Sequence, residues 1–337
     1  MKRVNMLVIT ILVAVALILG MLLLYIPKEE TKYSVKIGNV PAITYAPTYI
    51  AISLFMDDVG INATYIAFPS GTKAREALIT GDIDFASLST VHVPIARLKD
   101  RPLKIVLSLH SREIFSLMVR SELKDTVKDV KDLRGLKLGF SAPGAGSWAF
   151  AVYFLKKAGL EPEKDVEMVA VGELSTMYSA LKAGKVDAAV TWDPLTTQLL
   201  ESGEAYALID LYDPEQHARL LGGEEAMSQV LVTRDDVIAK NPELVERIVK
   251  AHKMALEFIK REDARKVAEV LQPYFKGMDI ALLEKVVNRI KEAIREDGSL
   301  SESAYYVDLA PLIETGALER SVSFEEAVDW SFAGRRP

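Results

Sequence analysis

The stretch DLRGLKLGFSAPGAGSWAFAVYFLKKAGL, residues 132–160, predicts a turn, a short buried strand over 136–140, a glycine-rich loop and an amphipathic helix that begins near Ser147. A helix that starts directly after small residues leaves several backbone N–H groups unpaired, at the positive end of its dipole. Such a loop can hold an anion or a polar acceptor, or it can be a tight connection only. It lacks the lysine and threonine of a P-loop and the full glycine spacing of a dinucleotide motif, so it does not indicate a nucleotide.

The layout of this stretch occurs twice, at an offset of about one hundred residues. VKIGNVPA (35–42) matches LKLGFSAP (136–143), and ALITGDIDFAS (77–87) matches ALKAGKVDAAV (180–190). In both copies a glycine, Gly81 or Gly184, stands where a helix ends in the left-handed conformation. The aspartates Asp84 and Asp187 interrupt apolar runs, and we interpret both as structural. The repeat predicts two similar lobes.

Both copies alternate apolar runs typical of strands with helical patterns. The predicted strands are 35–39, 63–67, 83–87, 103–107, 136–140, 167–171, 188–191 and 207–209, and the predicted helices are 47–59, 72–80, 91–100, 148–158, 175–183 and 194–201. This alternation predicts an α/β fold in which each lobe is a mostly parallel sheet flanked by helices. We expect lobe 1 to comprise 33–115 and 237–337, with a helical C-terminal extension, and lobe 2 to comprise 116–236. Two crossing strands, 116–120 and 227–235, are expected to run side by side.

Residues 1–32 predict an N-terminal signal anchor and a polar spacer. Lys2 and Arg3 precede the apolar run 4–26, whose 23 residues exceed the roughly 20 that cross a bilayer. The positive charges predict a cytoplasmic N-terminus and an extracytoplasmic remainder. A cleaved signal peptide, giving a secreted or periplasmic protein, is the alternative.

Composition excludes several classes of site. The chain has no cysteine, which excludes disulfides, thiolate catalysis, cysteine-bound metals and a lipid-modified cysteine. Its formal net charge of −6 does not favour nucleic acid. The four histidines lie far apart in the sequence, so no metal site and no cofactor is predicted.

Open parallel sheets bind ligands beyond the carboxyl ends of their strands. The predicted ligand-binding residues follow such strand ends: in the first lobe Tyr45, Ser70, Gly71, Thr72, Ser87, Ser89 and His110, and in the second Ser141, Gly144, Ala145, Gly146, Ser147, Trp192 and Asp193. They would bind by hydrogen bonds and stacking, and none is assigned a catalytic step. Simple helix capping is the alternative for Ser70, and for Asp193 before Pro194.

The order of VKIGNVPA, SGTKAREALITGDIDFASLS, DLRGLKLGFSAPGAG, ALKAGKVDAAVTWDP and VLVTRDDVIAKNPELV resembles the solute-binding proteins of ABC importers for nitrate, sulfonate, taurine and thiamine precursors, the SsuA/THI5-like (NMT1) class. The resemblance covers essentially everything after residue 33. It implies a type II periplasmic-binding fold whose two lobes close on a small molecule. It also implies a monomer that delivers its solute to a membrane permease driven by a cytoplasmic ATPase.

The resemblance leaves two further classes and the solute open. Thiamine-pyrimidine synthases and some menaquinone-pathway enzymes share the fold, but the synthases resemble one another in a cysteine-rich motif that is absent here. A sensor ectodomain is disfavoured because no second membrane segment follows. Helix N-termini and hydroxyls favour sulfonate, nitrate or bicarbonate, whereas Tyr45 and Trp192 equally suit a pyrimidine or a flavin. No cleft arginine is predicted, since Lys73 and Arg75 can face solvent.

Overall fold

The computed structural model describes residues 33–336 except 315 and 317. Ser34–Pro337 form one compact unit. The predicted signal anchor and spacer, residues 1–32, lie outside the described residues. Within the described part of the chain, no helix has the length and apolar character needed to cross a bilayer.

The first lobe is built on a five-stranded sheet with the order β2-β1-β3-β10-β4. Its strands are β1 (Tyr33–Asn39), β2 (Ile61–Ala67), β3 (Phe85–Ser89), β4 (Leu103–Ser108) and β10 (Gln229–Arg234). β1 and β3 are parallel, whereas β10 runs antiparallel to both of its neighbours. Apolar side chains on the central strands, such as Ile37, Phe85 and Leu231, are fully buried and form the core of this lobe.

The second lobe repeats this sheet with the order β7-β6-β8-β5-β9. Its strands are β5 (Ser116–Arg120), β6 (Lys137–Phe140), β7 (Glu167–Ala170), β8 (Ala188–Thr191) and β9 (Ala205–Asp210). β6 is parallel to β7 and β8, and β5 is antiparallel to β8 and β9. Strand for strand, the order matches that of the first sheet, so the duplication read from the sequence is a duplication of the fold.

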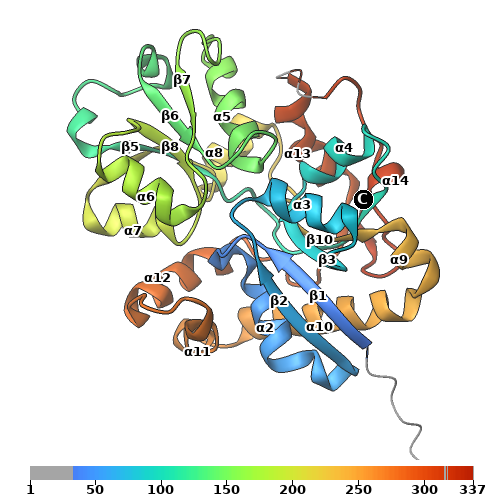
Figure 1. Cartoon of the computed structure of the whole chain (residues 1–337). Coiled ribbons are helices and arrows are strands. Elements are labelled where there is room, and N and C mark those ends of the chain that lie inside the picture. Colours follow the sequence, from blue (N-terminus) through green and yellow to red (C-terminus); the bar gives the residue numbers. More distant parts are fainter. Residues whose placement is uncertain (1–32, 315, 317, 337) are drawn as a thin grey trace, which may run out of the picture. The chain divides into compact units, whose positions relative to one another are not determined.

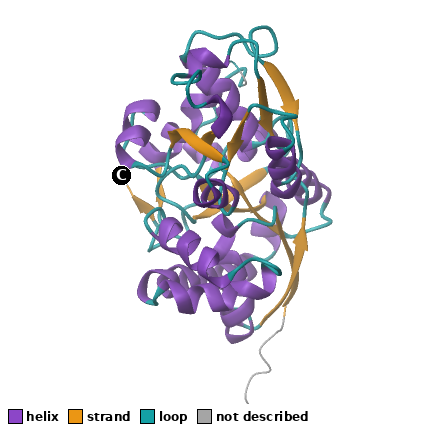
Figure 2. Ribbon diagram, turned by 90° about the vertical axis from the view of Figure 1, so that its left-hand side faces the viewer, coloured by secondary structure: helices purple, strands orange, loops and turns teal. Residues whose placement is uncertain are grey.

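Helices lie against the strands of both sheets (Figures 1 and 2). Those of the first lobe are η1 (Ile43–Tyr45), α2 (Ala46–Ile50), η2 (Ala51–Phe55), η3 (Asp57–Val59), α3 (Gly71–Thr80) and α4 (His92–Arg97). Those of the second lobe are η4 (Ser121–Leu123), η5 (Val130–Leu133), α5 (Gly146–Lys157), α6 (Leu174–Lys182), α7 (Leu195–Ser202) and α8 (Pro214–Leu221). The C-terminal part holds α9 (Asp235–Lys240), α10 (Pro242–Arg261), α11 (Ala264–Leu271), η6 (Gln272–Tyr274), α12 (Ile280–Lys291), α13 (Glu302–Glu314), α14 (Phe324–Ala327) and the short strands β11 (Leu300–Ser301) and β12 (Arg335–Arg336).

The expected side-by-side pairing of the two crossing strands is wrong. β5 pairs with β8 and β9 in the second sheet, and β10 pairs with β3 and β4 in the first. Each of these strands therefore joins the sheet of the lobe that the chain enters: β5 joins the second sheet and β10 the first. β10 is buried from Gln229 to Thr233, as a strand of either sheet would be, so its own sequence does not say which sheet it joins. We propose that the second lobe ends near Ser228, and not at residue 236 as expected.

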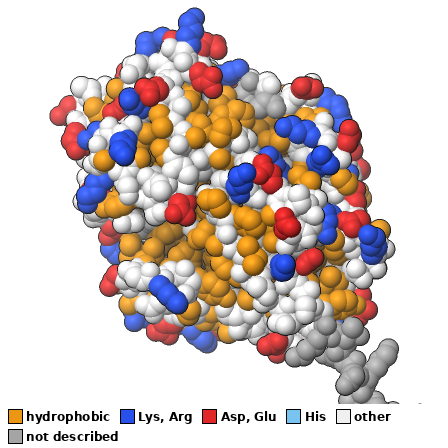
Figure 3. Space-filling model, viewed as in Figure 1, with side chains coloured by type: hydrophobic (Ala, Val, Ile, Leu, Met, Phe, Trp, Pro, Cys, Tyr) orange, Lys and Arg blue, Asp and Glu red, His pale blue; other side chains and the backbone are white. Residues whose placement is uncertain are grey.

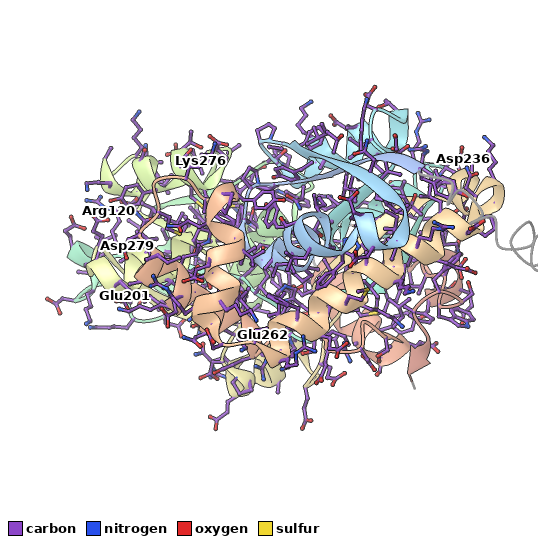
Figure 4. All side chains as sticks on the ribbon, turned by 90° about the horizontal axis from the view of Figure 1, so that it is seen from below. Arg120, Glu201, Asp236, Glu262, Lys276 and Asp279 are labelled. Atoms are coloured by element: carbon purple, nitrogen blue, oxygen red, sulfur yellow. The ribbon has the colours of Figure 1, made fainter. Side chains whose placement is uncertain are left out.

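The C-terminal helices contact both lobes. α10 packs on α2 and η2 of the first lobe, whereas α12 contacts α7 and α13 contacts α5 and α8 of the second. On the face seen in Figure 3, acidic and basic side chains are interspersed and form no basic field. Figure 4 shows Asp279, the N-cap of α12, on the same side of the molecule as Glu201 of α7, which pairs with Lys285 of α12. The second lobe is thus tied to helices that follow the first-lobe strand β10.

Candidate functional site

A cavity of about 30 Å³ has walls from both lobes. It is lined by Val40, Thr44, Tyr45, Gly71, Ser89, His92, Ile114, Phe115, Ser141, Ala145, Gly146, Ser147, Trp192 and Gln229. A water molecule needs roughly 10–15 Å³ of such volume, so the cavity holds only two or three water-sized groups. The two lobes are therefore closed against each other.

Eight of the fourteen predicted site residues line this cavity. They are Tyr45, Gly71, Ser89, Ser141, Ala145, Gly146, Ser147 and Trp192. All eight follow a predicted strand end or open a predicted helix. The rule that places ligands beyond the carboxyl ends of strands therefore located the cavity from both sides.

Three of the other predicted residues have structural partners in the first lobe. Ser70 caps α3 by accepting from the Lys73 N–H at 3.3 Å. The Ser87 hydroxyl lies 2.6 Å from that of Thr48. His110 is fully buried, with its Nε2 2.7 Å from the carbonyl oxygen of Thr44. None of the three lines the cavity, and of their side-chain polar atoms only His110 Nδ1 lacks a hydrogen-bond partner among the described residues.

The remaining three lie at contacts between lobes or behind the cavity wall. The Thr72 hydroxyl donates to the carbonyl oxygen of Pro143 across the lobes, at 3.1 Å. The carbonyl oxygen of Gly144 accepts from Arg75 Nη1 at 3.4 Å. Asp193 is fully buried one residue before Pro194, the N-cap of α7, and accepts from the Thr197 N–H and hydroxyl at 2.9 and 2.7 Å. Ser70 and Asp193 thus both accept from the first turn of the following helix, as the capping alternative expects, and their role in ligand binding stays a prediction.

Six residues of the lining were not predicted: Val40, Thr44, His92, Ile114, Phe115 and Gln229. His92 lies three residues after Ser89, and extending the hydroxyl-rich run by one turn would have found it. Phe115 directly precedes the crossing strand β5, a position that suggests proximity to the cleft. Gln229 was missed because β10 had been assigned to the other sheet. Val40, Thr44 and Ile114 carry no distinguishing signal in the sequence.

The second-lobe wall is the start of α5. Its N-cap is Ala145, which has no side-chain acceptor, so the first backbone N–H groups of the helix receive no cap. Behind it, the Ser147 hydroxyl accepts from the Ser141 N–H at 3.0 Å and lies 2.9 Å from the Ser141 hydroxyl. A Cβ on Gly146 would stand 2.7 Å from Phe115 Cζ and 2.9 Å from Ser89 Oγ. The closed arrangement therefore requires glycine here.

The first-lobe wall is formed by α3 and α4. A Cβ on Gly71 would lie 2.4 Å from His92 Nε2, so the imidazole packs directly on the backbone that opens α3. The other ring nitrogen, Nδ1, lies 3.3 Å from Arg75 Nη1. Arg75 is only 9% exposed, contrary to the expectation that it could face solvent. The structure thus places Arg75 close to the cavity, with the lining residue His92 between the two.

Aromatic rings and unpaired polar atoms complete the cavity. Phe115 and Trp192 meet edge to face, with ring centroids 6.0 Å apart. Among the described residues, no hydrogen-bond partner reaches the buried Ser89 Oγ, Thr44 Oγ1 or Gln229 Oε1. Buried polar atoms normally have partners, so these three atoms are available to a bound molecule.

Burial shifts the pKa values of His92, Tyr45 and Glu113 towards their neutral forms. Burial, with the Arg75 charge adding to it, lowers the pKa of His92 well below its usual value. Burial raises the pKa of the Tyr45 phenol above its ordinary value, and Glu113 behind it adds to the shift. Burial likewise raises the pKa of the Glu113 carboxyl. The cavity therefore presents hydrogen-bonding groups and aromatic surface, with no charged side chain in its lining.

A buried ion pair lies behind Trp192. Nε of Arg289, on α12, lies 2.9 Å from Asp193 Oδ2, at an angle that makes an ion pair and not a hydrogen bond. Nη2 of the same guanidinium donates to Asp210 Oδ1 at 2.6 Å. The guanidinium carbon also lies 4.3 Å from the centre of the Tyr212 ring. α12 thus anchors the second-lobe wall of the cavity.

The chain resembles several curated proteins. It is 21% identical over 320 residues to the putative binding protein YtlA of Bacillus subtilis, which covers 91% of this chain and 90% of that protein. It is 29% identical to the riboflavin-binding protein RibY of Chloroflexus aurantiacus over 63% of this chain, and 25% identical to the taurine-binding periplasmic protein of Escherichia coli over 60% of it. The matched region spans 58% of each of these two relatives.

Solved structures share the fold. The alkanesulfonate-binding protein SsuA of Xanthomonas axonopodis pv. citri, bound to MOPS, superposes with a TM-score of 0.70 at 19% identity over 90% of this chain and 98% of that one. The desulfurization enzyme DSZB superposes with a TM-score of 0.60 at 16% identity, over 90% and 98% of the two chains. The fold is therefore that of periplasmic binding proteins, and an enzyme also uses it. The model of the NMT1-like family matches residues 28–272, most of the sequence, and the chain belongs to that family.

Proposed function

We propose that this chain is the extracytoplasmic solute-binding protein of an ABC importer. It captures a small solute between its lobes and delivers it to a membrane permease driven by a cytoplasmic ATPase. The observation that carries the proposal is the cavity lined from both lobes, into which Ser89, Thr44 and Gln229 direct buried polar atoms without protein partners. The names of the taurine-binding and riboflavin-binding relatives and of the sulfonate-binding SsuA support the same role.

Closure follows from the contacts between the lobes. The hydrogen bonds from Thr72 to Pro143 and from Arg75 to Gly144 join the first lobe to the second beside the cavity. A sulfonate or a heterocycle exceeds two or three water-sized groups, so the solute must enter while the lobes are apart. The lobes then close by a hinge movement, and the walls replace the hydration of the solute with hydrogen bonds and aromatic contact.

The residues that we propose to contact the solute are the eight predicted lining residues together with His92, Phe115, Thr44 and Gln229. Uncapped N–H groups and hydroxyls suit an oxyanion, and the rings of Tyr45 and Trp192 suit a planar heterocycle. Both classes therefore belong in a binding test. We assign no catalytic role to any residue of the cavity.

Residues 1–32 would hold the protein at the outer face of the cell membrane as an uncleaved signal anchor. Cleavage of the same segment would instead release the protein outside the cytoplasm. The N-terminal sequence of the chain purified from its natural cells decides between these forms. An N-terminus at Met1 supports the anchor, and one beyond residue 26 supports cleavage.

The test of the proposed function is the stability of the purified full chain against a panel of alkanesulfonates, nitrate, bicarbonate, pyrimidines and flavins. A solute at about one hundred times its dissociation constant adds roughly 2.7 kcal/mol to the free energy of unfolding, which shifts the denaturant midpoint. Trp192→Ala should remove this shift while the variant stays folded. Chemical conversion of the compound during the assay would contradict the proposal in favour of an enzyme.

A further inference from the structure

The imidazole of His92 has different surroundings at its two nitrogens. Nδ1 lies 3.3 Å from Arg75 Nη1, inside the first lobe. Nε2 lies against Gly71 at the cavity wall, and the described residues offer it no hydrogen-bond partner. The ring therefore has one nitrogen committed to the fold and one available to the cavity.

The neighbour at Nδ1 decides where the proton is. A guanidinium carries only donors, so Arg75 can interact favourably with Nδ1 only if Nδ1 is an acceptor. Burial and the adjacent positive charge disfavour the imidazolium, and a neutral ring has a single proton. That proton must then be on Nε2, and Nε2 can only donate to a molecule in the cavity.

Arg75 is itself unusual. It is 9% exposed, and among the described residues no carboxylate lies within ion-pair distance of it. Its other contact is the carbonyl oxygen of Gly144 in the second lobe, 3.4 Å from Nη1. A buried charge without a carboxylate partner gives the closed cavity a positive potential, which favours a negatively charged or electron-rich group inside it.

The opposite wall supplies donors as well. The uncapped N–H groups of α5 lie at its start, beside Gly146. The unpaired Ser89 hydroxyl lies 2.9 Å from the place that a Cβ on Gly146 would occupy. Donors from both lobes thus face one small volume, and His92 supplies a donor that cannot change to an acceptor while Arg75 is in place.

We propose that Arg75 is a specificity-determining residue that acts through His92. Its guanidinium holds His92 in the Nε2–H tautomer, so the cavity selects solutes that present an oxygen acceptor, either an oxyanion or a carbonyl, over solutes that present an ammonium group. The selection rests on the proposed solute-binding function, whereas the tautomer does not.

The tautomer is measured by NMR of the full chain labelled with ¹⁵N-histidine, with the His92 signals assigned by their loss in His92→Gln. The expected result in the unsubstituted protein is an unprotonated Nδ1 and a protonated Nε2. Arg75→Met should release the ring, so that the Nδ1–H form becomes populated. The matched control is Lys73→Met, which removes an exposed cation from the same helix, paired only with Glu76, and should leave the His92 signals unchanged.

Two spectroscopic results would overturn the assignment. One is an Nδ1–H or doubly protonated His92 in the unsubstituted protein, a measurement that requires no variant to fold. The other is a folded Arg75→Met protein whose His92 tautomer is unchanged. A purely structural role for Arg75 would lower stability without moving the ring proton, so the spectrum separates the two roles.

Selection is measured by calorimetry with ethanesulfonate and ethylammonium as a matched pair of probes. We expect ethanesulfonate to bind, ethylammonium not to bind, and Arg75→Met to weaken ethanesulfonate binding about tenfold, the effect of one lost hydrogen bond. Equal binding of both probes, or unchanged affinity in Arg75→Met, would refute the selection. If neither probe binds while the solute panel gives a hit that lacks an oxygen acceptor, the selection fails and the proposed function stands. If nothing in either set binds, both fail and only the tautomer remains.

Discussion

The two lobes are built alike but differ where they meet the cavity. In both, an aspartate after the glycine-terminated helix accepts from a backbone N–H of the first strand: Asp84 from Lys36 at 2.8 Å and Asp187 from Lys137 at 2.9 Å. By contrast, α3 of the first lobe is capped by Ser70 and gives Gly71 to the cavity lining, whereas its counterpart in the repeat, α6, has Glu173 as an N-cap without a side-chain hydrogen bond and gives no residue to that lining. The repeat thus retains the contacts that join strand to helix and diverges at the surfaces available to a solute.

The lobes also differ in how they are supported. The second-lobe wall depends on Arg289 of α12, whose charge pairs with the fully buried Asp193. Arg289→Met would leave this carboxylate buried beside Asp210 without a cation. Loss of one partner of a buried pair costs about 3–5 kcal/mol, and we expect about 3 kcal/mol because the Arg289 side chain is partly exposed. Urea unfolding of the full chain measures this loss.

Lys285→Met is the matched control. Lys285 lies on the same helix and pairs with Glu201 of the second lobe, but both side chains are about half exposed. An exposed pair contributes about 0–1 kcal/mol. If the two variants lose equal stability, the buried pair is not the anchor of the second-lobe wall.

The junction between the lobes holds a buried carboxyl pair. Glu113, on the first crossing, and Asp308, on α13, interact through a side-chain hydrogen bond, and burial raises the pKa of both, that of Asp308 well above its usual value. Ser228, on the second crossing, donates to Glu113 Oε2 at 2.8 Å, and the Met227 N–H donates to Asp308 Oδ2 at 2.8 Å. Two buried carboxyls in contact share a proton, since two adjacent negative charges would repel.

This shared proton predicts a pH dependence with a definite sign. Because the folded pKa of Asp308 is raised, its contribution to stability is complete below the ordinary aspartate pKa of about 4 and is lost as pH rises towards the folded value. Asp308→Asn has no proton to lose. The difference in unfolding free energy between the protein and this variant should therefore move in favour of the variant by up to about 1.4 kcal/mol per pH unit above pH 4. Urea unfolding at pH 4, 6 and 8 measures it, and a constant difference would show that the pair shares no proton.

The parts that the sequence predicted are those fixed by local pattern. Gly81 and Gly184 adopt φ of +83° and +64°, as their place after a helix requires, and the predicted strands and helices of both lobes occur within a few residues of their observed bounds. Eight of the cavity residues were predicted because the carboxyl ends of parallel strands lie at one edge. Local pattern does not encode which sheet β10 joins, nor that Arg75 folds back onto His92. Both depend on pairings between segments distant in sequence, and these were the features that were missed.

Gly146→Ala tests the divergent wall. The added Cβ would stand 2.7 Å from Phe115, which packs on Phe150 of the same helix, and 2.9 Å from Ser89 of the first lobe, so it would strain the second-lobe wall as well as hinder closure. Overpacking costs about 1–3 kcal/mol, which would weaken solute binding by about 10- to 100-fold. Small-angle scattering with and without the solute should show reduced compaction, and the urea midpoint without solute should fall because Phe115 is displaced from Phe150. Full compaction and unchanged affinity would show that the closed lobes leave more room here than the structure indicates.

The smallest expected effect tests the part of the comparison in which the lobes agree. Asp84→Ala and Asp187→Ala each remove one carboxylate that accepts from a backbone N–H, at nearly equal distances in the two lobes. Each should lower the free energy of unfolding by about 1–2 kcal/mol, and the two losses should agree within about 0.5 kcal/mol because the sites lie far apart and share no partner. Arg120 Nη1 lies 4.0 Å from Asp187, which adds a weak attraction in the second lobe only. If the loss at Asp187 exceeds the loss at Asp84 by more than about 1 kcal/mol, the attraction to Arg120 contributes more than the backbone hydrogen bond that the two lobes share. The lobes would then differ in the contacts that join strand to helix as well as at the cavity.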